Sequence, residues 1–147
     1  MEEEFALLVN VLWGKCIQNL NQTLEETEQS KFSNNDYYYL YVIDSLGEPN
    51  FSMIADALHL TRPGVTAIVK KLCNMGLVSK KQSNEDKRVY YVSLTAKGKN
   101  ILNGDREVYR NVTKEIAAFC KDEKEKEFVQ NMLKMLVQKM SDNGLLL

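Results

Sequence analysis

Side chains that suit an anion recur along one face of the segment 61–75. If this segment is helical, Arg62, Thr66 and Lys70 follow one another at single-turn spacing. A guanidinium can bond both acceptors of a guanine edge, and an ammonium attracts phosphate as a point charge. These residue types at this spacing predict contact with duplex DNA. We expect Arg62 to read a base or else to clamp a phosphate, and Lys70 and Lys71 to contact phosphates.

A second cluster of charges, Asp86-Lys87-Arg88, follows a run of turn-forming residues. Arg88 can enter a narrow minor groove, where the negative potential is greatest. Asp86 can hold that guanidinium by a charge-assisted pair. The alternative is a plain hairpin in which Asp86 only makes a turn. Lys80, Lys81 and Lys87 add attraction for phosphate without sequence preference.

The charges of the chain are unevenly distributed, although its formal net charge is only −1. Residues 1–61 carry two Lys or Arg against ten Asp or Glu, residues 62–99 carry nine against two, and residues 100–147 carry eight of each. Because charges beyond a Debye length of about 10 Å are screened, a polyanion responds to the local field. The basic centre favours DNA docking by the middle of the chain, against the alternative of a merely uneven solvated surface.

The element that must position the first cluster is a helix over Thr61–Met75. Thr61 suits the N-cap, Pro63 falls in the first turn, where its missing N–H costs nothing, and Gly76 is a stop signal. The expected buried stripe is Val65, Ile68, Val69 and Leu72. The opposite face carries Arg62, Gly64, Thr66, Ala67, Lys70 and Asn74, with Lys71 beside it.

Beyond this helix the apolar period changes from 3.6 to 2, which is typical of strands. Leu77–Gln82 and Arg88–Leu94 are expected to pair as a hairpin, because the second is rich in Val and Tyr. The loop Ser83–Lys87 would join them. The hairpin, Leu77–Leu94, would carry the second cluster of charges at its tip.

Two short helices are expected before the helix over Thr61–Met75, which we call the recognition helix. One is Tyr37–Leu46, N-capped by Asn34, Asn35 or Asp36 and ended by Gly47 and a turn at Pro49. The other is Ser52–Leu58, and its inward residues are expected to be Met53, Ile54, Ala57 and Leu58. The stretch Glu25–Lys31 is polar and joins the first of these to the N-terminal segment.

Long amphipathic helices are expected at both ends of the chain. The N-terminal one has apolar residues at Phe5, Leu8, Val9, Leu12, Trp13, Cys16, Ile17 and Leu20. Thr95 would cap the next, with inward Ile101, Val108, Tyr109, Val112, Ile116 and Phe119, although Gly104 could interrupt it. Asp122 would open the last, with Phe128, Met132, Leu133, Leu136, Val137 and Met140. These faces exceed what a small domain can cover, so we expect a homodimer.

The patterns together predict a mainly α fold with a small β-hairpin wing. This is a winged helix-turn-helix with N- and C-terminal dimerisation helices. The predicted organisation is a dimerisation helix over 1–30, a DNA-binding domain over 31–98 and C-terminal dimerisation helices over 99–147.

Two strings of residues resemble the MarR family of bacterial regulators, and the resemblance covers nearly the whole chain. The first is Leu60-Thr61-Arg62-Pro63-Gly64-Val65-Thr66, continued by Val69-Lys70-Lys71-Leu72 and Gly76-Leu77-Val78. The second is Asp86-Lys87-Arg88, followed after five residues by Leu94-Thr95-Ala96-Lys97-Gly98.

The resemblance implies a homodimer on a palindromic operator, usually a repressor, often released by phenolic or other small ligands or by oxidation. One departure concerns Ala67, because the family commonly has Arg or Lys at this position. Base readout would then depend more on Arg62, Thr66 and a thymine-methyl contact of Ala67 itself. The DNA-binding residues we predict are Ser52, Thr61, Arg62, Gly64, Thr66, Ala67, Lys70, Lys71, Asn84, Asp86, Lys87 and Arg88.

A ligand pocket is a second expectation, at the junction of the DNA-binding and dimerisation parts. Its candidate residues are Trp13, Cys16, Phe32, Tyr37 and Tyr41, for which plain core packing is the alternative reading. Members of the family bind aromatic acids at this place. A thiol-based sensor acting through Cys16 is an alternative, but a buried structural cysteine is favoured because no base or helix N-terminus is evident beside it.

Composition excludes several other classes of protein. Three widely spaced cysteines fit neither a disulfide framework nor a CxxC metal site, and no cofactor is expected. A single histidine, His59, expected in a loop or at a helix end, leaves no nucleophile–base pair for an enzyme. No apolar run is long enough for a membrane span, and the acidic start is unlike a secretory signal, so a cytoplasmic location is expected. The remaining alternative is a winged-helix module that binds an acidic protein partner.

Overall fold

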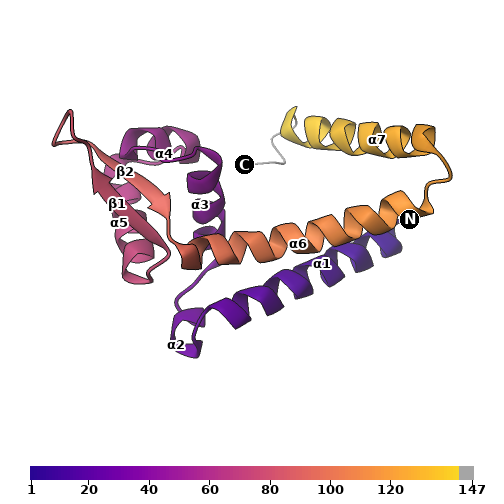
Figure 1. Ribbon diagram of the computed structural model, residues 1–147, viewed down its shortest axis with the longest axis horizontal. Helices are drawn as coiled ribbons and strands as arrows, with labels where there is room; N and C mark the ends of the chain where they lie inside the picture. Colours follow the sequence, from indigo (N-terminus) through magenta and orange to yellow (C-terminus); the bar gives the residue numbers. More distant parts are fainter. Residues whose placement is uncertain (143–147) are drawn as a thin grey trace. The chain divides into compact units, whose positions relative to one another are not determined.

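A computed structural model describes residues 1–142 of the chain (Figure 1). In chain order its elements are α1 (Glu2–Thr23), α2 (Glu26–Gln29), α3 (Asn34–Ser45), α4 (Phe51–Leu58), α5 (Arg62–Asn74), β1 (Val78–Gln82), β2 (Tyr90–Leu94), α6 (Ala96–Phe119) and α7 (Glu123–Asp142). The fold class is confirmed: a mainly α protein with one antiparallel hairpin among the described residues. Two compact units divide the chain, Met1–Val108 and the part that starts at Tyr109. The predicted functional division at residues 31–98 stays a prediction.

The core of the first unit lies among α3, α4, α5, the hairpin and the start of α6. The predicted stripe of α5 is confirmed, since Val65, Val69 and Leu72 are fully buried and Ile68 packs against the core. Further members of the core are Leu40, Ile43, Ile54, Leu77, Val92 and Ile101. Burial of this stripe in the core therefore fixes the orientation of α5 and directs its opposite face to solvent.

The ends of α5 are fixed by the residues expected to do so. Thr61 is the N-cap, and its Oγ1 accepts from the Gly64 N–H at 3.3 Å. At the other end Gly76 has a φ of +67°, and the Leu77 N–H donates back to the Leu72 carbonyl at 2.9 Å. This bond pattern ends a helix with one left-handed residue, a conformation that glycine adopts without a Cβ clash. Leu77 thus belongs to the helix-ending turn.

Both strands of the hairpin begin later in the sequence than expected. β1 and β2 pair from Val78 opposite Leu94 to Gln82 opposite Tyr90. The expected strands began at Leu77 and Arg88, which was wrong. Residues 83–89 form the turn, because the Ser83 N–H donates to the Val89 carbonyl at 2.9 Å.

The inward face of α4 also differs from the expectation. Ile54 and Ala55 are buried, whereas Met53 is 43% exposed and Ala57 is exposed. The helix begins at Phe51, one residue earlier than expected, and Asn50 caps it. Counted from Phe51, steps of three and four place Ile54, Ala55 and Leu58 on one face, so Met53 and Ala57 fall outside it. His59 ends the helix in the left-handed region (φ 52°), and its predicted place at a helix end is confirmed.

The polar stretch before α3 is more ordered than the pattern indicated. It contains α2, closed by a capping box between Glu25 and Glu28. α3 begins at Asn34, and its N-cap is Ser33, so the expected caps and the start at Tyr37 were wrong. Asp36 lies instead at the third helical position, where its Oδ2 accepts from the Ser33 N–H at 2.7 Å.

Gly104 does not interrupt α6. A Cβ at this position would collide with the Asn19 side chain of α1. The Asn19 amide donates to the Ile101 carbonyl at 2.9 Å and to Asp105 Oδ1 at 3.2 Å. The glycine therefore allows α1 to approach α6 within the first unit. Thr95 caps α6 as expected, since its Oγ1 accepts from the Gly98 N–H at 3.2 Å.

The helices at the two ends leave most of their apolar side chains exposed in the single chain. Neither α1 nor α7 contains a buried residue. In α6, Ile101 is buried as expected, but Tyr109 is exposed and Phe119 is 85% exposed. No helix within residues 1–142 combines the length and apolar character that a membrane crossing requires.

Candidate nucleic-acid interface

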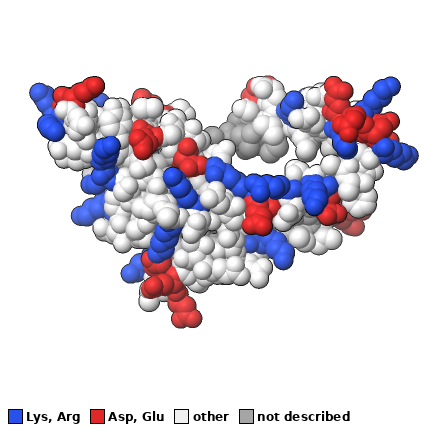
Figure 2. All heavy atoms as spheres, in the orientation of Figure 1, with Lys and Arg blue, Asp and Glu red and all other residues white. Residues whose placement is uncertain are grey.

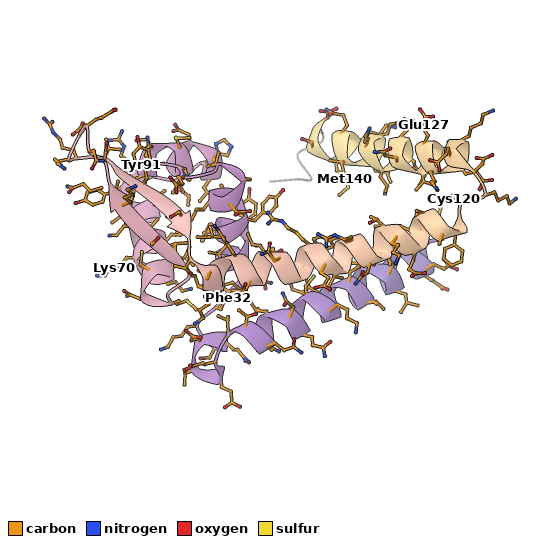
Figure 3. The ribbon with its side chains drawn as sticks, in the orientation of Figure 1. Phe32, Lys70, Tyr91, Cys120, Glu127 and Met140 are labelled. Atoms are coloured by element: carbon orange, nitrogen blue, oxygen red, sulfur yellow. The ribbon has the colours of Figure 1, made fainter. Side chains whose placement is uncertain are left out.

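The outer face of α5 presents a row of side chains to solvent. Arg62, Thr66, Ala67 and Lys70 are all exposed, and Figure 3 shows Lys70 pointing away from the core. The Thr66 Oγ1 donates to the Arg62 carbonyl at 3.0 Å, which leaves its lone pairs free to accept. This row can follow a groove of duplex DNA.

A groove of about 430 Å³ runs between the start of α5, the start of α4 and the hairpin. We call it the wing-side groove; its lining includes Asn50, Ser52, Arg62, Thr66, Arg88 and Tyr90. Four residues predicted from separate parts of the sequence therefore share one site: Ser52, Arg62, Thr66 and Arg88. The groove can hold an anion, because it joins two guanidinium side chains, two hydroxyls and the beginning of a helix.

Asn50 and Tyr90 were missed as residues of this groove. The Asn50 Oδ1 accepts from the Ser52 and Met53 N–H groups, both at 3.0 Å, and so fixes the start of α4. An Asn immediately before an apolar helix is a capping signal that could have identified it. Nothing in the sequence pattern indicates that Tyr90 lies beside Arg62.

The tip of the hairpin holds Arg88 mainly by its backbone. Asp86 Oδ1 accepts from the Arg88 N–H at 2.9 Å, whereas the Arg88 Nε lies 4.0 Å from the same oxygen. The Arg88 side chain is 95% exposed. Across the hairpin, the Gln82 Nε2 donates to the Lys87 carbonyl at 2.6 Å. Asp86 thus shapes the turn, and the guanidinium of Arg88 extends into solvent; Asn84, Asp86 and Lys87 are exposed around it.

Lys71 differs from its neighbour Lys70 in having a partner inside the chain. Its Nζ lies 2.5 Å from Asp36 Oδ2, and Asp36 is only 2% exposed. The carboxylate also accepts from the Ser33 hydroxyl at 2.7 Å. The Lys71 ammonium therefore ties α5 to α3, while among the described residues Lys70 has no ion-pair partner.

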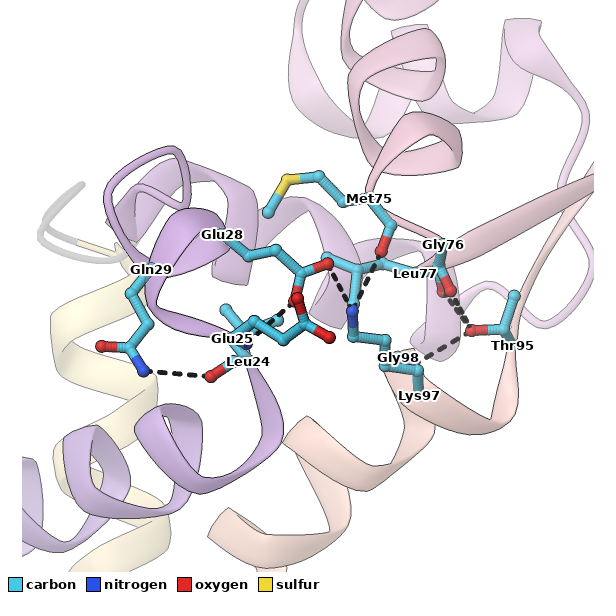
Figure 4. Close-up of polar contacts among 10 residues, drawn as sticks. All are labelled: Leu24, Glu25, Glu28, Gln29, Met75, Gly76, Leu77, Thr95, Lys97 and Gly98. Atoms are coloured by element: carbon cyan, nitrogen blue, oxygen red, sulfur yellow. Dashed lines mark hydrogen bonds and ion pairs between the residues drawn. The ribbon is translucent and has the colours of Figure 1, made fainter.

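A second ion pair joins α2 to the start of α6, beside the C-terminal end of α5 (Figure 4). The Lys97 Nζ lies 2.5 Å from Glu28 Oε1 and donates to the Met75 carbonyl at 3.4 Å. The Lys97 hydrogen bond, followed by a backbone bond from Glu25, holds the pKa of Glu28 below its usual value. Beside it, the Thr95 hydroxyl donates to the Gly76 carbonyl at 2.6 Å. These contacts join α2, the end of α5 and the start of α6.

Basic side chains gather where the predicted interface lies. Figure 2 shows Lys and Arg along the edge formed by α5 and the hairpin, while Asp and Glu gather over α2. The basic stretch of the sequence is therefore also a basic surface, apart from the cations of Lys71 and Lys97, which are paired within the chain.

The expected ligand residues are found in different surroundings. Phe32 and Tyr37 pack against the core, whereas Trp13 and Tyr41 are 51% and 54% exposed. Cys16 is half-buried on α1. Their common role in a ligand site stays a prediction.

Comparisons with known proteins agree with this geometry. Residues 32–90 match the model of the MarR family. No curated protein matches the sequence significantly.

Solved structures match over nearly the full length of the chain. Streptococcus pneumoniae FabT, crystallised in complex with DNA, is 23% identical, with a TM-score of 0.66 over 96% of this chain and 94% of that chain. The S. aureus MepR–DNA complex is 18% identical, with a TM-score of 0.68 over 94% and 98%. The transcriptional regulator Tm0710 of Thermotoga maritima is 19% identical, with a TM-score of 0.60 over 99% and 97%. At these identities the likeness concerns the fold.

Proposed function

We propose that the chain is a MarR-family regulator of transcription that binds DNA sequence-specifically; the match of residues 32–90 to the model of that family supports this proposal. It acts as a homodimeric repressor on a palindromic operator. The wing-side groove is the observation that carries this proposal, because it joins the start of α5 to the hairpin through Arg62 and Arg88. Family members regulate transcription and are not enzymes, so we propose no catalytic activity.

The residues along α5 and the hairpin divide into base-reading and phosphate-binding groups. Arg62 and Thr66 project from the first turns of α5, the part of a recognition helix that reaches base edges. Arg88 enters the adjacent minor groove from the wing. Ser52, Lys70 and Lys87 contact phosphates, which position the protein without reading the sequence.

Homodimerisation is supported by the uncovered apolar side chains of α1 and, separately, of α7. Such faces are stable in water only when a partner covers them. In a two-fold dimer the recognition helices meet successive major grooves, whose centres are roughly 34–36 Å apart. The operator is then an inverted repeat with half-sites about one turn apart.

Selection of bound duplexes from a random pool tests the proposal. We expect an inverted repeat, and we expect Arg62→Ala to relax the preference at one position in each half-site. Arg110→Ala, on the exposed surface of α6, is the matched control and should select the wild-type sequence. Recovery of no enriched sequence by the wild type would contradict sequence-specific binding.

Release by a small aromatic ligand is the finer part of the proposal. The half-exposed rings of Trp13 and Tyr41 offer stacking surfaces for such a ligand. Titration with salicylate at millimolar concentration should quench or shift the fluorescence of Trp13, the only tryptophan, and dissociate the operator complex. An unchanged spectrum together with an intact complex would exclude this class of effector at that site.

A further inference from the structure

A second groove, of about 520 Å³, lies beside the recognition helix. We call it the α2-side groove. α5 contributes Ala67, Lys70 and Asn74 to its lining, and α2 with the residues that follow it contributes Glu28 and Lys31. Thr66 lines the wing-side groove and Ala67, the next residue, lines this one. The outer face of α5 therefore lies between two grooves.

The α2-side groove has an excess of positive charge. Two carboxylates near it are already engaged, Glu28 by Lys97 and Asp36 by Lys71, each at 2.5 Å. Lys31 and Lys70 are exposed, and neither has an ion-pair partner within residues 1–142. Two cations from separate elements are thus available to an anion that enters the groove.

The segment that carries Lys31 is held firmly against the rest of the unit. The Lys31 N–H donates to the Glu28 carbonyl at 3.0 Å, and the Glu28 carboxylate is bound to Lys97 (Figure 4). The Gln29 side chain donates to the Leu24 carbonyl at 3.0 Å. A fixed backbone lowers the conformational entropy that Lys31 loses when it binds.

A helix in the major groove has one phosphate backbone on each side, since that groove is only about 12 Å wide. On the wing side, Ser52 and Lys87 contact one backbone in the proposed complex, and Ser52 lines the wing-side groove. We propose that the α2-side groove is a phosphate-binding site for the other, in which Lys31 and Lys70 contact the DNA strand on the side away from the wing. This inference rests on the proposed DNA-binding function and adds Lys31, which no sequence motif indicated, to the interface.

The test compares Lys31→Ala with Lys114→Ala, a lysine exposed on α6. Binding of a random-sequence duplex is followed by fluorescence anisotropy over a series of salt concentrations. Each lost phosphate contact should lower the slope of log affinity against log salt by about 0.9, so a dimer that loses one contact per protomer should lose about 1.8 in slope and roughly sixtyfold in affinity at 0.1 M salt. Lys114→Ala should match the wild type. Circular dichroism checks that each variant is folded.

Two further variants separate a charge contact from a structural effect. Lys31→Arg should retain the wild-type slope, and Lys31→Glu should bind more weakly than Lys31→Ala. A slope and affinity of Lys31→Ala equal to those of Lys114→Ala would overturn the inference while leaving DNA binding intact. Failure of the wild type to bind any duplex would instead overturn the proposed function, and this inference with it.

Discussion

The middle of the chain and its terminal helices differ in how completely they bury their apolar side chains. Between α3 and β2 the apolar side chains that face inward are buried within one chain, and Leu40, Val65 and Val92 are fully enclosed. α1 and α7 contain no fully buried residue and leave most of their apolar side chains exposed. One chain thus builds a complete recognition element, whereas its terminal helices need another surface to cover them. Stability of the first region should be intrinsic, and stability of the second should depend on concentration.

The largest effect is expected from a cavity in the middle of the chain. Leu72 is fully buried behind the outer face of α5, so Leu72→Ala should lower the free energy of unfolding by about 2–5 kcal/mol. Urea denaturation measures this loss. Met53→Ala, a truncation at a 43% exposed position of α4, is the control and should cost far less. Equal losses would mean that α5 is not anchored by its inner face.

The recognition helix could be predicted because its signals are local. The cap at Thr61, the stripe from Val65 to Leu72 and the stop at Gly76 all lie within one segment, and the structure agrees with each. The inward face of α4 could not be predicted, because nearly all residues of this short helix are apolar and several faces fit the pattern, so that only packing against the rest of the unit selects Ile54 and Ala55.

The site was predicted less completely than the fold, because its charges pair over long sequence distances. Lys71 has the pattern of an exposed cation, yet its partner is Asp36, 35 residues earlier. Lys97 pairs with Glu28, 69 residues earlier. Nothing local indicates either pair, and the first engages a lysine that was predicted to contact phosphate. The same distance hides the closeness of Lys31 to Lys70.

A smaller effect is expected from truncation on a terminal helix. Leu136 in α7 is about half exposed in the single chain, so its truncation should remove only part of a side-chain burial, about 1 kcal/mol per protomer in the dimer. Leu136→Ala should therefore weaken dimerisation and lower the melting temperature at a given protein concentration. An unchanged association constant in sedimentation experiments would show that α7 lies outside the interface.

The wing allows a comparison of a side-chain contact with a backbone contact. Arg88→Ala should lower the salt slope of duplex binding by about one unit for each Arg88 that loses its DNA contact. Asp86→Ala should reproduce only part of this loss, because Asp86 holds the Arg88 backbone at 2.9 Å and its guanidinium at 4.0 Å. Equal defects in the two variants would show that Asp86 orients the side chain as well. Wild-type affinity of Arg88→Ala at low salt would place the wing off the DNA.

The smallest effect concerns the anchor of α2. The pKa of Glu28 is lowered in the folded chain by its hydrogen bond from Lys97. When the pKa of a carboxyl is lower in the folded chain than in the unfolded chain, the carboxylate stabilises the fold at every pH above the unfolded pKa, near 4.5. This contribution is lost as the pH falls from that value through the folded pKa. Glu28→Gln should therefore reduce the acid sensitivity of unfolding in that range, measured by urea denaturation at several pH values. An identical pH profile for the two proteins would mean that the ion pair adds nothing to stability.

The number of chains bound per duplex tests most directly whether the middle of the chain binds DNA and the terminal helices join two copies. Sedimentation equilibrium of the wild-type chain with one duplex that carries the selected inverted repeat gives the number of 16.9 kDa chains bound. If the middle of the chain reads one half-site and the terminal helices join two copies, two chains should bind per duplex, and the free protein should already be a dimer at micromolar concentration. A monomeric protein that binds the duplex one chain at a time would contradict this account.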